Sequence, residues 1–444
     1  MIKKIKLTDT QIIAISFLII ILLGTFLLMT PVANNNGQWL AWEDALFTAT
    51  SSTCVTGLVI ADTGTQFSLY GQIVIITLIQ IGGLGFITFM TLFSIFIKRK
   101  ISLSERKLIM QSTGTLQIGG TVKLVRRIAL GTLLFEGCGA LILAIRFSFD
   151  YPWGKAIYYG IFHSVSAFCN AGFDVFGKGT SLAPYTTDPT VMLTICALIF
   201  IGGLGFLVWS DMVETNFCAT HFRLHTKLAL FTSVFLVVGG TVFFLLTESR
   251  HAFSHLHFGE KVIASLFQAI TPRTAGFAAI DLNTLKESSY LVTIIFMFIG
   301  GSPGSTAGGI KTVTLAVLFL GAVAKIKQTE YPVVFKKRLG SEIVEQASAV
   351  GVLYLMAVIT ATVVISQVEP FSLQQILFEV TSAIGTVGLT LGITPQLTVY
   401  SKLILCLLMY MGRVGGLSFA LALRERKSSG AATADRPAEK VIIG

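Results

Sequence analysis

Charged side chains are scarce in this sequence. They make up 13% of the 444 residues, whereas hydrophobic residues make up 53%. Soluble domains carry about 25% charged residues. The composition therefore excludes an ordinary soluble globular protein, and the chain has to be divided into segments that cross a membrane.

Motifs for metal or disulfide chemistry are also missing. No two of the six cysteines form a C-x-x-C pair, the six histidines show no ligand spacing, and there is no H-E-x-x-H. These absences argue against a disulfide framework, a zinc site or a membrane-embedded metalloenzyme. We therefore expect no enzyme activity and no cofactor in this chain.

Long apolar runs are what the sequence has instead. A transmembrane helix needs about 20 apolar residues, and eight runs reach that length. They lie near residues 11–30, 72–97, 128–146, 190–210, 227–247, 290–324, 348–368 and 400–423. The basic Met1–Lys6 precedes the first run, which we expect to be a retained helix rather than a cleaved signal. Glu136, in the middle of the third run, is expected to pair inside the helix bundle.

The basic residues indicate the orientation. With the N-terminus in the cytoplasm, 23 of the 33 lysines and arginines fall in cytoplasmic segments and 8 in outer loops. Short cytoplasmic loops of membrane proteins are enriched in Lys and Arg. This split predicts a multi-pass protein of the plasma membrane with both termini in the cytoplasm. Because the net charge of +10 gathers in these loops, it does not indicate a nucleic-acid partner.

A short amphipathic stretch that ends near a glycine occurs four times, each time between an odd and an even apolar run. The four stretches are Leu46–Leu58, Ile161–Phe173, Leu266–Phe277 and Leu377–Leu389, with a phenylalanine nine or ten residues before Gly57, Gly172, Gly276 and Gly388. Each is too short to span and too apolar for a surface loop, which is typical of a re-entrant pore loop. Four such turns around one axis would present a ring of carbonyl oxygens that replaces the hydration shell of a cation.

A second motif repeats with the first. Downstream of each stretch lies a glycine-rich sequence: Ile81–Phe86, Ile201–Phe206, Ile299–Gly304 and Met411–Gly416. The predicted fold is therefore an all-α integral membrane protein of four tandem span–pore-loop–span repeats, with eight transmembrane helices around one central pore. The expected divisions are residues 1–10 (cytoplasmic N-terminus), 11–100, 101–215, 216–330 and 331–423 (the four repeats), and 424–444 (cytoplasmic tail).

These motifs resemble the membrane subunit of the Ktr/Trk/HKT superfamily of potassium transporters, and within it the bacterial Ktr type. The resemblance covers nearly the whole chain. It implies a potassium-channel-like fold in which four filter turns bind K⁺, and the fourth turn is the nearest to the T-V-G of tetrameric potassium channels. The filter residues it implies are Val55, Thr56, Gly57, Asn170, Ala171, Gly172, Thr274, Ala275, Gly276, Thr386, Val387 and Gly388.

The same resemblance implies an assembly and a selectivity. It implies a homodimer with one pore per subunit, and a cytosolic regulatory ring of the RCK type that binds the nucleotide. Family members that prefer sodium have serine at the first filter glycine. Because this chain has Gly57 there, the resemblance favours potassium.

The sixth apolar run contains a glycine-rich segment that predicts a break. A helix over all of 290–324 would be about 50 Å long, against a hydrocarbon core of about 30 Å. We expect two half-helices joined by an intramembrane loop that acts as a gate below the filter, with Arg413 facing it. The predicted gate residues are Gly300, Gly301, Ser302, Pro303, Gly304, Ser305, Thr306, Ala307, Gly308, Gly309 and Arg413.

Two questions stay open at this point. Arg273 either braces the filter through an acid such as Glu379 or faces the outer vestibule. The alternative function is a cation-coupled secondary transporter, although such a protein would favour inverted repeats and buried acids. A dependence of potassium uptake on sodium also stays open.

Overall fold

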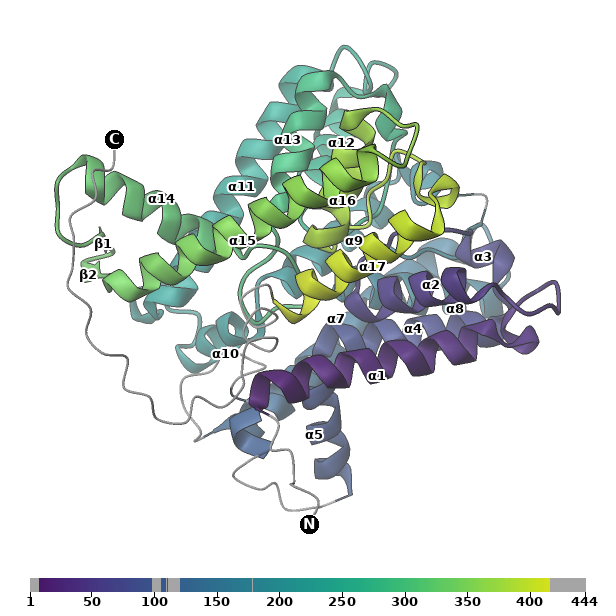
Figure 1. Ribbon diagram of the computed structural model, residues 1–444, viewed down its shortest axis with the longest axis horizontal. Helices are drawn as coiled ribbons and strands as arrows, with labels where there is room; N and C mark the ends of the chain where they lie inside the picture. Colours follow the sequence, from purple (N-terminus) through teal and green to yellow (C-terminus); the bar gives the residue numbers. More distant parts are fainter. Residues whose placement is uncertain (1–7, 98–104, 109, 111–119, 178, 416–444) are drawn as a thin grey trace.

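The computed structural model describes residues 8–97, 105–108, 110, 120–177 and 179–415, and it is helical (Figure 1). The first predicted repeat holds α1 (Asp9–Met29), the 3-10 turn η1 (Pro31–Ala33), α2 (Trp42–Cys54), α3 (Thr63–Gln66), α4 (Leu69–Leu84) and α5 (Phe86–Phe96). The second holds α7 (Thr121–Phe147), α8 (Trp153–Phe168), η2 (Ala183–Tyr185), α9 (Pro189–Gly203) and α10 (Phe206–Glu214).

The second half of the chain follows the same order of elements. The third predicted repeat holds η3 (Ala219–His221), α11 (Leu224–Glu248), α12 (Phe258–Ile270), η4 (Leu282–Thr284), α13 (Glu287–Phe298) and α14 (Thr312–Ile326). The fourth holds the strands β1 (Val333–Val334) and β2 (Lys337–Arg338), then α15 (Ser341–Ser366), α16 (Leu373–Gly385), η5 (Thr394–Gln396) and α17 (Val399–Val414). The antiparallel β1–β2 hairpin is the one departure from an all-α fold in the described residues.

The first long helix of each repeat is continuous and apolar. Four helices of the described residues, α1, α7, α11 and α15, are long and apolar enough to cross a membrane, and α9 with α10 makes a fifth span if the bent pair is one crossing. The first begins at a capping box, in which the Thr8 side chain accepts from the Gln11 amide and the Gln11 side chain bonds the Thr8 amide. The chain is therefore a multi-pass membrane protein.

The second long run of each repeat is not a continuous helix, contrary to the prediction for 72–97 and 190–210. The helix breaks at Gly85, with φ +81°, and at Gly205, with φ +97°. Glycine adopts this left-handed region without a steric penalty, so it ends the helix. The angle between α9 and α10 is 87°. In the fourth repeat α17 ends before Gly415, with φ +95°, and residues 416–423 of the predicted span lie outside the described residues.

The four short helices lie inside the bundle and join the repeats. Each packs against the first long helix of its own repeat, in the pairs α1–α2, α7–α8, α11–α12 and α15–α16. Each also packs against the helix that begins the second long run of the preceding repeat, in the pairs α4–α8, α9–α12, α13–α16 and α17–α2. The repeated phenylalanines Phe47, Phe162, Phe267 and Phe378 are at most 1% exposed and anchor these helices in the core. An ion pair of 2.9 Å between Lys402 and Asp44 also links α17 to α2. The last repeat therefore closes on the first.

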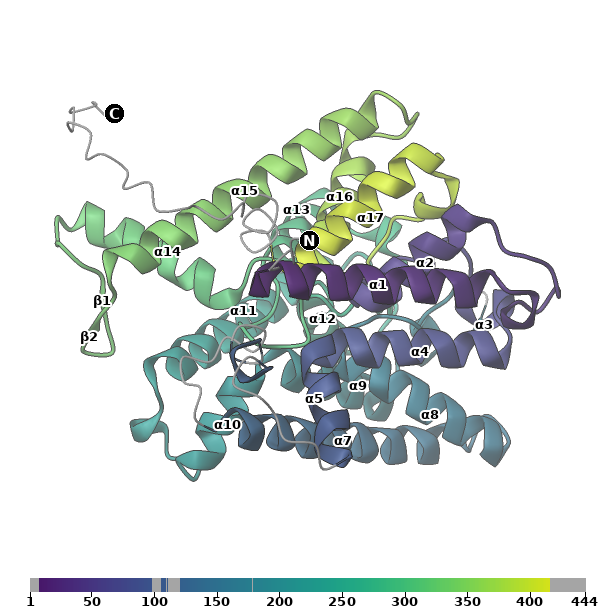
Figure 2. The same ribbon diagram turned by 60° about the horizontal axis from the view of Figure 1, so that its bottom comes forward.

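One arm stands away from this bundle. Helix α14, the β1–β2 hairpin and the start of α15 project to one side in both views (Figures 1 and 2). The hairpin exposes Phe335 together with Lys336, Lys337 and Arg338. On the predicted orientation this arm lies on the cytoplasmic side.

Candidate functional site: a ring of four glycine turns

Each short helix ends in a turn with the same unusual backbone. The first residue of every predicted filter turn is left-handed: φ is 59° at Val55, 60° at Asn170, 72° at Thr274 and 50° at Thr386. Such values are uncommon for residues other than glycine, and strained backbone of this kind clusters at functional sites. The glycine two residues later is also left-handed in all four turns, with φ between 69° and 94°. The four turns are therefore copies of one conformation.

The four glycines meet one another in a closed ring. A Cβ added to Gly57 would lie 2.3 Å from the carbonyl oxygen of Ala171. The same relation continues around the ring. An added Cβ would lie 2.7 Å from the Ala275 oxygen at Gly172, 2.3 Å from the Val387 oxygen at Gly276, and 2.2 Å from the Thr56 oxygen at Gly388. No side chain fits at any of these positions. The turns thus bring together, in chain order, four carbonyl groups from four parts of the sequence.

Hydroxyl groups support each turn from behind, which the sequence interpretation missed. The Gly57 amide donates to Ser51 Oγ and the Gly388 amide to Ser382 Oγ, both over 3.1 Å. In the other two turns the hydroxyl donates to a carbonyl just past the glycine, from Ser166 to Phe173 over 2.7 Å and from Thr271 to Phe277 over 2.6 Å. A serine or threonine five or six residues before each glycine was the available signal.

Two threonine hydroxyls at the ring have no protein partner. Thr56 Oγ1 and Thr386 Oγ1 are buried and make no hydrogen bond with any described residue. Leaving a buried hydroxyl unpaired costs about 1–3 kcal/mol. Two oxygens next to the carbonyl ring are therefore free to bind a further group.

The glycine-rich segment 299–311 packs against the ring. A Cβ added to Gly308 would lie 2.0 Å from Thr386 Oγ1, and one added to Gly300 would lie 3.2 Å from Thr274 Cγ2. The Thr306 hydroxyl donates to the carbonyl of Phe168, at the end of α8, over 3.2 Å. The segment therefore contacts three of the four turns or their helices.

The rest of this segment is held by its own short contacts. Ser302 Oγ lies 3.0 Å from Thr312 Oγ1, and Ser305 Oγ donates to the Ser302 carbonyl over 2.7 Å. Ile299 and Ile310 form a parallel bridge that closes the segment at its base. Residues 299–311 thus form a compact loop between α13 and α14, which are the two halves of the sixth apolar run.

Two cations bind the carbonyls of this loop. Arg413 donates from one guanidinium nitrogen to Thr306 and from another to Gly82 and Gly83, the last over 2.9 Å. Lys311 Nζ donates to Ala307 over 2.6 Å and to Gly308 over 3.2 Å. The contact between Arg413 and the loop was predicted from the sequence. Lys311 was given no role there, although its place directly after the glycine-rich segment was a usable signal.

Both predicted placements of Arg273 are wrong. Arg273 is only 7% exposed, so it does not face the outer vestibule. Its guanidinium donates to the carbonyl and hydroxyl of Ser233 in α11, over 3.3 and 3.2 Å. Glu379 instead accepts from the hydroxyls of Thr390 and Thr394, which ties the segment beyond Gly388 to α16.

Glu136 pairs inside the bundle, as predicted. Its carboxylate accepts from Gln80 Nε2 over 3.1 Å and lies 3.8 Å from Cys169 Sγ. Cys169 directly precedes the second turn, so this carboxyl contributes to the packing behind the ring rather than lining it.

The segment that follows the second turn carries a carboxyl group with a raised pKa. Asp174 follows Gly172 by two residues. Burial, and then the nearby Asp62 carboxylate, raise the pKa of Asp174 to about 7. The charge on this side of the ring therefore changes near neutral pH.

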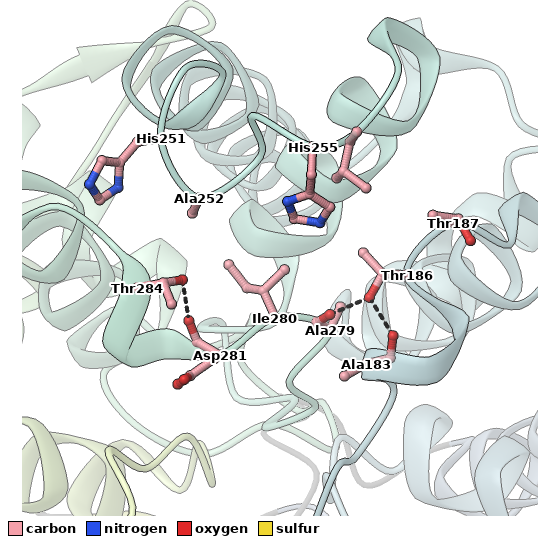
Figure 3. A pocket seen from close by; sticks show the side chains of 11 residues that line it. Ala183, Thr186, Thr187, His251, Ala252, His255, Ala279, Ile280, Asp281 and Thr284 are labelled. Atoms are coloured by element: carbon pink, nitrogen blue, oxygen red, sulfur yellow. Dashed lines mark hydrogen bonds between the residues drawn. The ribbon is translucent and has the colours of Figure 1, made fainter.

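A separate cavity of about 520 Å³ lies beyond the third turn. It is lined by residues of three outer segments, among them His251, His255, Thr186 and Asp281 (Figure 3). Nowhere in the described part of the chain do three or more His, Cys, Asp or Glu side chains gather in a way that could hold a metal ion. The cavity lining includes no residue of the four turns, so the cavity is distinct from the carbonyl ring.

Comparison with known proteins gives one consistent family. The model of the TrkH family, described as cation transport protein, matches residues 4–432. The Ktr system potassium uptake protein B of Bacillus subtilis is 41% identical over 430 residues, which is 96% of each chain. The potassium/sodium uptake protein NtpJ of Enterococcus hirae is 37% identical, over an alignment that covers 99% of this chain and 98% of the Enterococcus chain.

A solved structure has the same fold. The potassium transporter TrkH from Vibrio parahaemolyticus superposes on this chain with a TM-score of 0.75, at 17% sequence identity. The superposition covers 95% of this chain and 86% of the Vibrio chain. The resemblance inferred from the repeated motifs is thereby confirmed. The chain belongs to the TrkH family of cation transport proteins.

Proposed function

We propose that this chain takes up potassium across the plasma membrane, through a pore whose selectivity filter is the ring of four glycine turns. The closed ring of carbonyls next to Gly57, Gly172, Gly276 and Gly388 carries the proposal. Irregular backbone at membrane depth is tolerated where it lines a water-filled path, and backbone carbonyls are the ligands that K⁺ filters use. The choice of potassium follows from the relatives, which are named as a potassium uptake protein and a potassium/sodium uptake protein.

In this proposal the four short helices α2, α8, α12 and α16 are pore helices, and the chain holds four span–pore-loop–span repeats. The broken second runs complete eight crossings of the membrane. The filter residues are the twelve of the predicted turns, with the unpaired Thr56 and Thr386 hydroxyls as additional oxygen ligands.

The loop 300–309 is proposed as the gate. It contacts the filter turns through Gly300 and Gly308, and two cationic side chains, Arg413 and Lys311, hold it there. A positive charge close to the ion path raises the electrostatic barrier for K⁺. Moving the loop together with Arg413 would open the path.

The alternative is a secondary transporter that couples potassium entry to sodium. The Enterococcus relative carries both cations in its name, so a role for sodium stays within the proposal. The two candidates differ in one respect: a pore conducts K⁺ down its gradient without Na⁺, whereas a coupled transporter does not.

The proposed assembly is a homodimer with a cytosolic ring of nucleotide-binding RCK-type subunits. The Bacillus relative is named as protein B of a Ktr system, which supports a partner subunit. The arm of α14, β1 and β2 offers exposed Lys336, Lys337 and Arg338 beside the gate half-helix. A partly acidic docking face on the partner would complement it. The competing interpretation is that these basic residues contact anionic lipid only.

Expression of this chain alone in cells that lack potassium uptake tests the function and the partner together. We expect weak uptake that does not respond to nucleotide, restored to full rate by a co-expressed cytosolic subunit. Cells with an empty vector give the baseline. Full, nucleotide-responsive uptake by the chain alone would refute the partner requirement, and no uptake with either arrangement would refute the function.

A further inference from the structure

The elbow between α9 and α10 is bonded to the intramembrane loop. The Ser302 amide donates to the Gly203 carbonyl over 2.9 Å, and the Thr306 amide donates to Gly202 over 3.4 Å. In the opposite direction, the Phe206 amide donates to the Gly304 carbonyl over 2.8 Å. Phe206 is the first residue of α10, whose amide has no partner within its own helix. Two backbone bonds therefore tie the loop to the end of α9, and one ties it to the start of α10.

The elbow also leaves no free space next to the loop. A Cβ added to Gly205 would lie 2.7 Å from the Pro303 carbonyl oxygen. Across the bend, Trp209 Nε1 donates to the Ile201 carbonyl over 3.1 Å, and the Trp209 ring packs on Phe168 with centroids 5.6 Å apart. Contacts of the Trp209 side chain with α9 and with the end of α8 thus brace the bend.

Ionic contacts hold the other end of α10 on two neighbouring helices. Asp211, 4% exposed, accepts the Arg223 amide at the start of α11 over 2.9 Å and lies 3.3 Å from the Arg223 guanidinium. Arg127 of α7 donates to Ser210 over 2.9 Å and to Glu214 over 2.5 Å. On the predicted orientation this end of α10 faces the cytoplasm.

We propose that α10 is the positioning element that holds the intramembrane loop beneath the filter, with Asp211 and the Arg127–Glu214 pair as its latch. This inference rests on the proposed role of the loop as a gate. Releasing the latch frees α10 to move, and the bond from the Phe206 amide of α10 to the Gly304 carbonyl carries that movement to the loop, while the bonds to Gly202 and Gly203 anchor the loop on α9. A cytosolic signal can then reach the gate through the second repeat as well as through the arm of α14.

Flux through the latch variants Asp211→Ala and Arg127→Gln tests the proposal. Loss of a buried charged acceptor is expected to raise K⁺ flux about fivefold or more for Asp211→Ala. The increase is about twofold for Arg127→Gln, because its partner Glu214 is 43% exposed and exposed pairs are weak. Asp211→Asn keeps an acceptor for the Arg223 amide and should lie between wild type and Asp211→Ala. The double variant Arg127→Glu with Glu214→Arg should bring the flux back toward the wild-type value, short of full recovery because the new arginine would face Arg223, whose guanidinium lies 3.5 Å from Glu214.

Glu369→Ala is the matched control. Glu369 is also a buried carboxylate, and it accepts the Thr398 amide at the start of α17 over 2.8 Å, just as Asp211 does for α11. The hydrogen bonds that its carboxylate makes with described residues lie at the start of α17, at the opposite end of that helix from Arg413, so its loss should leave flux per folded molecule unchanged. Flux is therefore normalised to the amount of protein that elutes as a single folded species.

A deletion of residues 301–308 separates the two hypotheses. If α10 acts through the loop, Asp211→Ala has no further effect on flux in the deletion background. A deletion that leaves flux unchanged overturns the gate itself. A deletion that raises flux, combined with latch variants that change nothing or that act equally in both backgrounds, overturns the role of α10. Should Asp211→Ala not fold, Arg127→Gln and its charge-swapped rescue decide the question.

Discussion

Replacing Gly57 with serine is expected to lower the selectivity for K⁺ over Na⁺ by on the order of tenfold. Gly57 has φ +89°, and a Cβ at this position would lie 2.3 Å from the Ala171 carbonyl oxygen. The new side chain must displace that oxygen or the turn itself, and a change of about 1.4 kcal/mol in relative ion binding is a tenfold change in selectivity. Competition between Na⁺ and Rb⁺, as a K⁺ tracer, for uptake by cells measures this ratio.

Gly392→Ser controls for backbone strain. Gly392 has nearly the same φ, +87°, but a Cβ added there meets nothing within 4 Å. This variant therefore carries the cost of a left-handed serine without touching the ring, and it should keep the wild-type ratio. An unchanged ratio in a folded Gly57→Ser protein would remove Gly57 from the filter.

Replacing Arg413 with alanine is expected to raise K⁺ flux by at least about tenfold, while the K⁺/Na⁺ ratio is retained. The change removes three hydrogen bonds from a charged donor, to Thr306, Gly82 and Gly83, each worth about 1.5–3 kcal/mol. It also removes a positive charge from beneath the filter. The ring itself is untouched, so the selectivity should not change. Tracer uptake at a fixed membrane potential measures the flux.

Arg413→Lys is the informative intermediate. Lysine keeps the charge but lacks the planar fork that reaches two sets of carbonyls at once, so flux should rise less than in Arg413→Ala. If both variants fold and conduct like the wild type, Arg413 does not restrict the path. If flux and selectivity change together, Arg413 supports the filter rather than the gate.

The ring of glycines was predictable because its signal repeats. One phenylalanine-to-glycine spacing would have indicated only a turn, but four copies between apolar runs imply four equivalent elements. Their closing order, from Gly57 to Gly172, Gly276 and Gly388, follows the chain order. The break in the sixth run was predictable from length, because the glycine-rich segment interrupts a run that is too long for one crossing.

The bends at Gly85 and Gly205 were not predicted, because hydrophobicity continues past the bend and gives no sign of direction. Each bend occurs at a glycine with positive φ. Sequence alone cannot distinguish such a glycine from one that packs against a neighbouring helix. Arg273 was misplaced for a similar reason. Its distance along the chain from the filter is short, but the direction of its side chain depends on the shape of a turn.

Contacts between distant segments were outside the reach of the sequence. The bonds between Gly203 and Ser302, and between Phe206 and Gly304, join residues about a hundred positions apart. No motif marks them, since backbone groups of any residue type could form them. They depend on the 87° bend between α9 and α10, which brings the start of α10 next to the loop.

Ion flux into vesicles that contain only the purified chain tests the central claim most directly. In one assay the vesicles have no Na⁺ on either side, and Rb⁺ entry down its gradient is measured. In a second assay Na⁺ replaces Rb⁺ at the same gradient, and the two entry rates are compared. A carbonyl filter predicts Rb⁺ entry without any Na⁺, at a rate clearly above that of Na⁺, and a loss of this preference in Gly57→Ser. Equal rates for the two cations, or Rb⁺ entry only when a Na⁺ gradient is supplied, would contradict a potassium-selective pore.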